Sequence, residues 1–439
     1  MKEYSYWLDT LDQSPVAGRQ SPADSRQPSV ESPQSVLSRT RDVVIVGAGY
    51  TGLSAARTLA RAGADVLVVE RERIGWGASS RNAGQVLTGL RLDPASLVAR
   101  YGQTRAREFF DAARAALARL EAIIEGEGID CQYERVGHLQ AASTRAHFDA
   151  FRREQELLAR VFDHRVHLVS RGEQRSELGS DAYHGLMVDE RSGALNPVRY
   201  VHGLAAAAVR AGAALATGVA VTHVQRTSDR WTVSTSPGIV HARDVLFATN
   251  GYTDTAAPSL RRRFVPIGSY IIVTAPLTAD AAGSLLPRRR TAFDSKHFLH
   301  YFRLTPDRRL LFGGRAEFSR PDLEATRRAA EILRRDLERV FPQLAGIAID
   351  YAWGGSVAFT RDQMPRAGML DGAYYAGGYC GHGIAMATYL GEQIARRIAG
   401  EAIQDPLFDD RFPAIPLYSG NPWFLPLVGA YYRLRDVID

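Results

Sequence analysis

The chain has 439 residues, 45% of them hydrophobic, which is enough for two domains with sizeable cores. It contains no run of about eighteen apolar residues and no apolar signal core near its start, so we expect neither a transmembrane helix nor a secretory signal. The two cysteines, Cys131 and Cys380, cannot form a disulfide framework, and no metal-ligand spacing occurs. This pattern indicates a reducing, cytoplasmic location.

The formal net charge is +6, and nearly all the basic charge is arginine, because lysine occurs only at Lys2 and Lys296. The arginines at 261–263 and 288–290 form short clusters without interleaved aromatic residues. We interpret them as solvated loops and expect no nucleic-acid partner; an anionic substrate is a milder alternative for some of these arginines.

Residues 13–40 are rich in Ser, Pro and Gln, which predicts a linker or a surface-draped arm at 1–40. The preceding SYWLDT is aromatic enough to dock on a surface, which the sequence does not identify.

The stretch 42–70 (DVVIVGAGYTGLSAARTLARAGADVLVVE) has the pattern of a strand, a glycine-rich turn, a helix and a second strand. Gly47, Gly49 and Gly52 follow the spacing G-x-G-x-x-G, which lets the backbone turn tightly, approach a pyrophosphate and pack helix on strand. Glu70 closes the second strand, where a carboxylate can accept hydrogen bonds from an adenosine ribose. We predict a dinucleotide site here; the alternative is a glycine-rich turn in another α/β fold.

After Glu70, residues 71–89 are small, polar and glycine-rich, which suits close approach to the rest of a cofactor. A helix is predicted at 93–128 and another at 196–212, with short strands between 214 and 249. Alternating segments at 266–315 predict an antiparallel sheet, followed by a charged helix at 323–341. The last residues, from 421 on, are apolar and aromatic; packing on this chain or a neighbouring subunit is favoured over contact with a membrane surface.

A second strand, glycine-rich loop and helix follow at 374–376, 377–383 and 384–398. Two such loops at opposite ends of the chain suggest FAD threaded through the protein rather than NAD. The fold class is therefore α/β with α+β elements: a Rossmann-like FAD-binding domain (41–90, 196–255 and 351–405) and a second, antiparallel-sheet substrate domain (91–195 and 256–350), with a tail at 406–439.

The motifs VVIVGAGYTGLSAARTLARAG, IGWGASSRNAGQ, ATNGY and GGYCGHGIAMA together resemble the FAD-dependent D-amino-acid, glycine and sarcosine oxidase superfamily. Within it, SYW, RNAGQ, YFRLTPDRRLLFGGR, FPQL with YAWGG, and AYYRLRD are most similar to the gamma-glutamylputrescine oxidase branch. The resemblance covers roughly residues 40 to 439.

The resemblance implies a set of residues around FAD. Those assigned to the pyrophosphate and adenosine are Gly47, Gly49, Tyr50, Thr51, Gly52, Glu70, Arg71 and Val221. Those assigned to the flavin are Gly77, Ala78, Ser79, Arg81, Asn82, Gly84, Gln85, Gly378, Tyr379, Gly381, His382, Gly383 and Ile384.

The resemblance also implies oxidation of a C–N bond in an amine or amino acid by hydride transfer, imine hydrolysis, and reoxidation by oxygen to give hydrogen peroxide. Two departures bear on this. The run 356–360 (SVAFT) lacks the cysteine to which relatives attach flavin, so we expect FAD to be non-covalent, and Cys380 to be a small packed residue. Leu311 stands where the sarcosine branch has an oxygen-activating lysine, so a dehydrogenase passing electrons to a quinone or partner protein remains an alternative, as does a flavin-binding subunit of a hetero-complex.

His382, Arg81 and Lys296 are the candidates to supply positive charge instead. A structural hydrogen bond for His382 and a surface position for Lys296 are the alternatives. The substrate pocket is expected on the second domain's sheet, where an arginine and a tyrosine can grip a carboxylate such as a glutamyl end. Its candidates are Tyr270, His300, Tyr301, Arg303 and Arg315, of which alternation along the strands turns about half away. The oligomeric state is left open.

Overall fold

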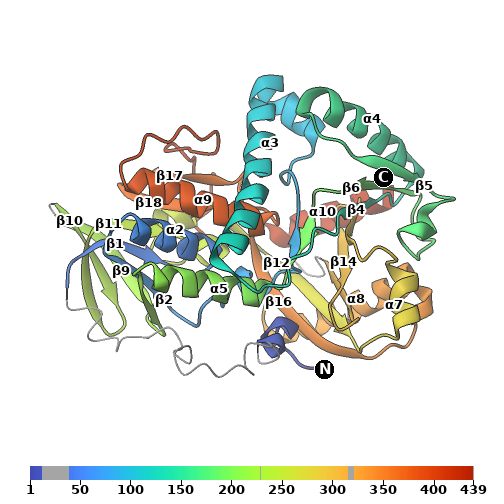
Figure 1. Cartoon of the computed structure of the whole chain (residues 1–439), viewed down its shortest axis with the longest axis horizontal. Helices are drawn as coiled ribbons and strands as arrows, with labels where there is room; N and C mark the ends of the chain where they lie inside the picture. Colours follow the sequence, from blue (N-terminus) through green and yellow to red (C-terminus); the bar gives the residue numbers. More distant parts are fainter. Residues whose placement is uncertain (12–38, 228, 315–320, 439) are drawn as a thin grey trace.

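The computed structural model describes residues 1–11, 39–227, 229–314 and 321–438, without the side chains of 432–438. Within this part of the chain, two eight-stranded sheets lie on the left and right of the molecule in Figure 1. The α/β class with a second, mainly antiparallel sheet is confirmed. The predicted linker at 13–40 lies almost wholly outside the described residues.

Five parallel strands form the centre of the first sheet, in the order β18-β11-β1-β2-β8. The side chains of β1 are buried on both faces from Val43 to Val46, which explains the unbroken apolar run at 43–46. Antiparallel strands extend the sheet beside β18 and β11. The bounds are β1 Arg41–Val46, β2 Val66–Glu70, β8 Ala214–Thr217, β9 Val221–Thr227, β10 Arg230–Thr235, β11 Gly238–Phe247, β17 Arg366–Leu370 and β18 Ala373–Gly377.

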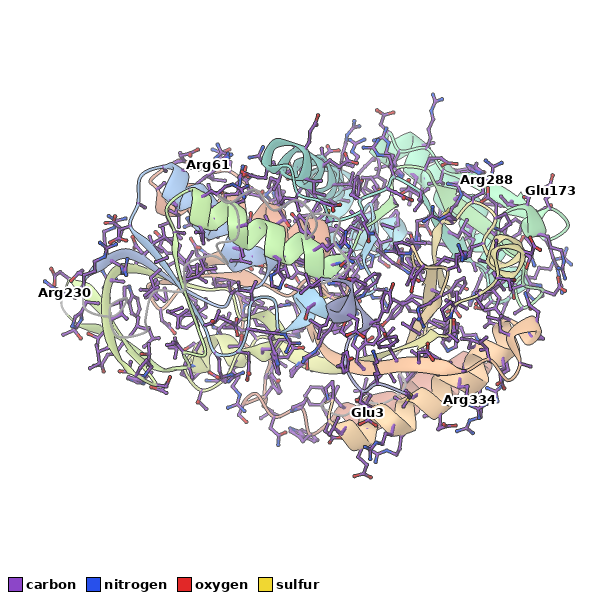
Figure 2. All side chains as sticks on the ribbon, turned by 60° about the horizontal axis from the view of Figure 1, so that its bottom comes forward. Glu3, Arg61, Glu173, Arg230, Arg288 and Arg334 are labelled. Carbon is purple, nitrogen blue, oxygen red and sulfur yellow. The ribbon has the colours of Figure 1, made fainter. Side chains whose placement is uncertain are left out.

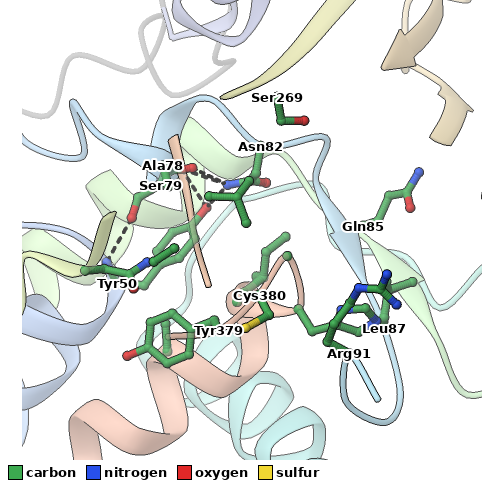
Figure 3. A pocket seen from close by; sticks show the side chains of 18 of the residues that line it. Tyr50, Ala78, Ser79, Asn82, Gln85, Leu87, Arg91, Ser269, Tyr379 and Cys380 are labelled. Atoms are coloured by element: carbon green, nitrogen blue, oxygen red, sulfur yellow. Dashed lines mark hydrogen bonds between the residues drawn. The ribbon is translucent and has the colours of Figure 1, made fainter. Parts of the chain in front are cut away.

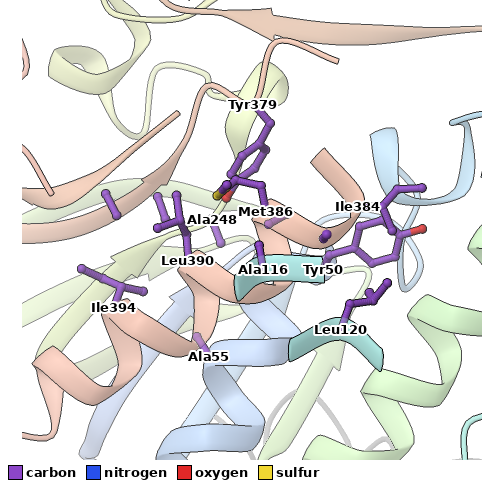
Figure 4. Close-up of a cluster of buried hydrophobic side chains, with 14 of the residues drawn as sticks. Tyr50, Ala55, Ala116, Leu120, Ala248, Tyr379, Ile384, Met386, Leu390 and Ile394 are labelled. Atoms are coloured by element: carbon purple, nitrogen blue, oxygen red, sulfur yellow. The ribbon is translucent and has the colours of Figure 1, made fainter. Parts of the chain in front are cut away.

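Four helices pack together on this sheet: α2 (Tyr50–Arg61), α3 (Pro94–Glu127), α5 (Pro197–Arg210) and α9 (Gly383–Ile398). Helix α3 contributes Ala113, Ala116 and Leu120 to the same buried cluster as α2 and α9 (Figure 4). The sequence-based division placed 91–195 in the substrate domain, but the small side chains of α3 let it pack closely against the helices of the FAD side.

The second sheet has the order β16-β12-β15-β14-β13-β4-β6-β5 and is antiparallel except where β13 pairs with β4. Helix α8 (Leu323–Val340) covers it with an apolar face that includes Leu333 and Leu337. The bounds are β4 His138–Ala141, β5 His167–Ser170, β6 Gly185–Asp189, β12 Val265–Thr274, β13 Thr291–Asp294, β14 His300–Leu304, β15 Leu310–Gly314 and β16 Ile349–Phe359.

Strand β16 shows where the sequence-based domain division differs from the structure. That division began the last FAD-domain segment at 351, whereas β16 pairs with β12 along its length, from Val265↔Phe359 to Thr274↔Ile349. The chain crosses back to the FAD side only after β16 ends.

Smaller elements complete the fold: α4 (Arg145–Phe162), which the sequence did not predict, α6 (Pro258–Arg261), α7 (Ala279–Leu285) and α10 (Leu425–Ile438). A short two-stranded sheet joins β3 (Gln85–Val86) to β7 (Gly193–Ala194). The N-terminal 3-10 helix η1 (Tyr6–Thr10) docks with Trp7 fully buried. Among the described helices, none combines the length and the apolar character that a membrane crossing requires.

The arginines are distributed over the surface rather than gathered in one place. Arg61, Arg230, Arg288 and Arg334 lie well apart in Figure 2. The cluster at 288–290 is matched by carboxylates: Arg290 is buried against Glu177 and Glu190. Many of these guanidinium groups therefore serve ion pairs within the chain.

Candidate active site

A cavity of about 570 Å³ lies where both glycine-rich loops meet the second sheet. Its lining includes residues of β2 and β9 of the first sheet, of the 76–85 loop and of helix α4. Figure 3 shows the part of the cavity where Tyr50, Ser79 and Asn82 face Tyr379 and Cys380. The predicted cofactor residues that line it are Gly47, Gly49, Tyr50, Thr51, Glu70, Arg71, Gly77, Ala78, Ser79, Arg81, Asn82, Gln85, Val221, Tyr379, Gly381, His382, Gly383 and Ile384. Gly52, Gly84 and Gly378 lie behind this wall and act through packing.

Two positions of the first loop require glycine, one because of a close contact and the other because of its backbone conformation. A Cβ on Gly52 would lie 2.0 Å from the carbonyl oxygen of Gly47, because the start of α2 rests directly on the end of β1. Gly47 itself has φ +107°, a left-handed conformation that other residues rarely adopt. The turn therefore holds the first amides of α2 at the cavity wall.

Helices α2 and α9 begin at the cavity wall without a side-chain N-cap, whereas α3, whose Asp93 and Pro94 also line the cavity, is capped. Neither Gly49 before α2 nor His382 before α9 gives a side-chain cap. In contrast, α3, α4, α5, α7 and α8 are each capped by an Asp, Asn or Thr side chain. The amide of Tyr50 at the start of α2 donates to Ser79 Oγ at 3.1 Å. The other first-turn amides and the positive end of each helix dipole are the partners that a pyrophosphate and an electron-rich flavin edge require, so the site fits FAD.

The two helices are locked to each other. A Cβ on Gly391 would lie 2.3 Å from the carbonyl oxygen of Thr51, so α9 touches the backbone of α2. The Ser54 hydroxyl donates to the carbonyl of Thr388 (2.6 Å), and the hydroxyls of Thr51 and Tyr379 share a 2.6 Å hydrogen bond. The two glycine-rich loops, more than 300 residues apart in sequence, thus form one rigid wall.

The acidic end of β2 is already engaged with the backbone. Glu70 accepts hydrogen bonds from the amides of Ala48 (2.9 Å) and Glu72 (3.0 Å) while lining the cavity. Arg71 beside it pairs with Asp254 at 2.9 Å. These contacts fix the end of the cavity where the sequence predicts the adenosine.

The loop at 80–84 is held by side chains from elsewhere in the chain, each donating to one of its carbonyl groups. Its donors are Ser5 Oγ to Ser80 (2.8 Å), Trp353 Nε1 to Arg81 (2.9 Å), Trp7 Nε1 to Asn82 (3.0 Å) and Arg303 Nη1 to Gly84 (2.9 Å). Because the carbonyls point away, the side chains of Arg81 and Asn82 are left at the cavity. The Arg81 guanidinium lies 4.3 Å from the centre of the Trp76 ring.

The three catalytic candidates all line this cavity. Burial lowers the pKa of His382 to about 3, with nearby Arg91 adding to the effect, and its Nδ1 is buried without a hydrogen-bond partner. A neutral imidazole does not supply the positive charge considered for it from the sequence. Lys296 is exposed on the turn between β13 and β14 and also lines the cavity. The surface position expected as an alternative therefore does not remove it from the site. Arg81 and Lys296 are thus the predicted cations at this wall.

Cys380 also lines the cavity, where burial raises the pKa of its thiol to about 11. The thiol donates to the carbonyl of Gly378 at 3.2 Å. A protonated, engaged thiol is a poor nucleophile, which agrees with FAD bound non-covalently.

Of the substrate candidates, Tyr301 alone lines the cavity among the described residues, with its hydroxyl 2.9 Å from Ser269 Oγ. Tyr270 packs on the opposite face of β12, among the apolar side chains beneath α8. Arg303 is buried and donates to the carbonyls of Gly84 and Leu195 rather than facing a substrate. Arg315 lies outside the described residues. Alternation along the strands explains why Ser269 reaches the cavity and Tyr270 does not.

His300 is held between two carboxylates instead of facing the cavity. Its Nδ1 lies 3.2 Å from Asp294 and its Nε2 3.3 Å from Asp336. Burial opposes the charge, but the two carboxylates outweigh it and raise the pKa of His300 to about 9. The imidazolium ties the β13–β14 turn, which carries Lys296, to α8.

We predict that this tie weakens in alkali. A folded-state pKa above the unfolded value of about 6.5 stabilises the protein fully below pH 6.5, and the contribution is lost as pH rises through about 9. The loss amounts to roughly 3 kcal/mol. Urea unfolding at pH 6, 7.5 and 9.5 checks this, with His300→Gln expected to flatten the profile over that range. Parallel profiles for wild type and variant would contradict the assignment.

Several cavity residues were not predicted from the sequence. They come from the 87–94 segment, α3, α4, the loop after α4, and the β4–β6 edge of the second sheet: Leu87, Arg91, Phe110, His138, Glu154, His164, Met187 and Asp189. One signal was available for Glu154, because it falls on the apolar face of α4 with Phe151 and Leu158. The others carry no local pattern that separates them from ordinary core or loop residues.

Comparisons with known proteins agree with this site. The family model described as FAD dependent oxidoreductase matches residues 42–397. The chain is 35% identical to gamma-glutamylputrescine oxidoreductase of Escherichia coli, over 90% of this chain and 93% of that protein. Its fold is similar to glycine oxidase from Geobacillus kaustophilus (TM-score 0.71, 21% identity, 83% of this chain and 96% of that one). It is also similar to L-proline dehydrogenase from P. horikoshii (TM-score 0.69, 20% identity, 84% and 96%). The chain therefore belongs to the FAD dependent oxidoreductase family, with FAD as its cofactor.

Proposed function

We propose that this protein oxidises the C–N bond of an amine or amino acid, with a gamma-glutamylated amine as the favoured substrate and oxygen as the electron acceptor. The observation that carries the proposal is the joining of two uncapped helix N-termini at one cavity that continues beyond them into the second sheet. The likeness to a gamma-glutamylputrescine oxidoreductase supports the substrate class. Two buried free cysteines support a cytoplasmic location.

Bound FAD supplies a two-electron acceptor for hydride. The neutral His382 imidazole adds no positive charge beside an incoming amine, and the uncapped α9 N-terminus stabilises negative charge that develops at the cavity wall. The carbon next to nitrogen loses hydride and the nitrogen loses a proton, which gives an imine. Water hydrolyses the imine to an aldehyde or keto acid and ammonia or an amine, and oxygen takes the two electrons and two protons to become hydrogen peroxide.

The test is anaerobic mixing of the purified holoprotein with gamma-glutamyl amines, polyamines, D-amino acids and N-methyl amino acids. We expect loss of the flavin absorbance near 450 nm with a gamma-glutamyl amine, and one peroxide per turnover when air is admitted. Bleaching by none of the four classes would contradict amine oxidation. Bleaching without peroxide in air would replace the oxidase by a dehydrogenase.

A flavin-binding subunit of a hetero-complex is the second candidate. Trp423 and Leu427 near the C-terminus are 63% and 70% exposed, which favours a partner surface there. Full turnover by the isolated chain would exclude this candidate.

A further inference from the structure

Helix α4 places a carboxylate on the cavity wall where the pattern of the helix calls for an apolar residue. Phe151, Glu154 and Leu158 follow one face of α4, and both apolar neighbours are buried. Glu154 and Leu158 line the cavity together with Phe110 of α3 and Met187 of β6. A carboxylate among such side chains is costly unless it has a partner.

The other carboxylates of the cavity wall all have partners within the chain. Glu70 and Asp254 are engaged as described above, and Asp93 caps α3 through the amide and hydroxyl of Ser96. Asp189 lies 3.4 Å from His164 Nε2, and Asp294 holds His300. Among the cavity-lining carboxylates of the described chain, Glu154 alone has neither a hydrogen-bond nor an ion-pair partner.

The surroundings of Glu154 favour a cation. Burial, with a contribution from the Asp93 carboxyl, raises the pKa of Glu154 to about 7. Both effects oppose an isolated negative charge, and a positively charged group beside it would relieve them. The cations of the wall are engaged or stand on other segments. Arg71 pairs with Asp254, Arg81 stacks on Trp76, Arg91 acts on His382, and Lys296 is on the β13–β14 turn.

The position of α4 indicates which part of a ligand reaches it. The helix belongs to the second sheet's side of the molecule and packs against α3, away from the strands that line the adenosine end (Figure 1). The cavity lining on the side of α3, α4 and the second sheet includes the apolar side chains of Leu87, Phe110 and Met187. An alkyl chain suits this passage, and a charged group suits its end.

We propose that Glu154 binds an ammonium group at the end of the substrate remote from the oxidised C–N bond. The substrates would then be amines with a second cationic nitrogen, namely diamines, polyamines or aminoacylated diamines with a free α-amino group. This inference rests on the proposed function and narrows it: a linear amine without a second cation would be a poor substrate.

The test uses the holoprotein and two matched pairs of compounds. Gamma-glutamylputrescine is compared with glutarylputrescine, which lacks only the α-amino group, and 1,4-diaminobutane with 1-aminobutane. Anaerobic titration followed by flavin absorbance gives a Kd from the spectral perturbation, whether or not the flavin is reduced. The variants are Glu154→Gln, which keeps the shape and removes the charge, and Glu156→Gln as control, because Glu156 is exposed two residues along the same helix.

We expect wild type to bind the ammonium-bearing member of each pair about 10- to 100-fold more tightly, as a charge-assisted hydrogen bond provides. Glu154→Gln should abolish that preference and leave the affinity for the other member unchanged, and Glu156→Gln should match wild type. Equal Kd values within a pair, or a loss in Glu154→Gln that is the same for both members, would overturn the inference. Binding with this preference but without bleaching would instead contradict the proposed function alone.

Discussion

Replacement of Gly52 by alanine is expected to abolish FAD binding. The new Cβ would lie 2.0 Å from the Gly47 carbonyl oxygen and 3.2 Å from Ile45 Cγ2, and neither a backbone oxygen nor a central strand can move aside alone. Helix α2 would have to separate from β1, which removes its amides from the pyrophosphate site. We expect FAD to bind at least ~100-fold more weakly, a loss of about 3 kcal/mol. Purified protein would be colourless, and titration of FAD into apoprotein measures the change.

The matched control is Gly283→Ala, which adds the same methyl group inside helix α7. Nothing lies within 4 Å of the added Cβ, and alanine favours the helix by about 1 kcal/mol. This variant should keep its flavin and unfold no earlier than wild type. A yellow Gly52→Ala protein with wild-type FAD affinity would show that the contact between α2 and β1 does not govern the site.

Loss of the Trp7 side chain is expected to loosen the cofactor as well as the fold. Trp7 is 0% exposed, packs with Trp353 and Leu311, and donates to the Asn82 carbonyl in the loop that the cavity uses. Removing such a side chain costs about 3–5 kcal/mol. Trp7→Ala should therefore lower both the unfolding free energy and the FAD affinity, measured by urea unfolding and by reconstitution of apoprotein.

Trp7→Phe separates the hydrogen bond from the packing. It leaves a half-buried carbonyl of the 80–84 loop without its donor, at a cost of about 1 kcal/mol. Because that carbonyl belongs to Asn82, the visible circular dichroism of bound flavin should change. The control is Trp231→Phe in β10, a buried tryptophan that does not line the cavity. If Trp7→Phe and Trp231→Phe alter flavin affinity and dichroism equally, the hydrogen bond from Trp7 to the Asn82 carbonyl has no specific role in flavin binding.

The parts of the fold that were predicted correctly are those with strong local patterns. The β1–α2–β2 unit combines a buried strand, three spaced glycines and a periodic helix, and α9 repeats this logic after β18. Helix α4 is not among the predicted elements, although its buried residues Phe151, Leu158 and Phe162 recur with helical spacing. The sequence YAWGG shows no preference for either sheet, so it cannot place β16. The pairing of β16 with β12 depends on tertiary contacts that no local pattern records.

The residues of the candidate site also divide into those that local motifs predict and those that depend on tertiary contacts. The loops around FAD were predicted as motifs, and the structure brings most of those residues to one wall. The substrate candidates depended on which face each strand turns inward, and alternation alone cannot choose between Ser269 and Tyr270. Arg303 resembled a carboxylate-binding arginine, yet it satisfies backbone carbonyls that become buried only when three distant segments meet. Glu154 stands out only once its lack of a partner is known.

The docked N-terminal segment also has a consequence for the order of folding. The backbone of Lys2 pairs with β16 through the Asp350 carbonyl (2.6 Å) and the Ala352 amide (2.9 Å), and α2 needs α9 against it. Contacts separated by more than 300 residues form late, because a long chain segment must be ordered before they close. During synthesis, Lys2 therefore has no β16 partner until most of the chain has been made. We expect flavin uptake to follow this closure, so that a chain stopped before Gly383 would be left without cofactor however well its first domain had folded.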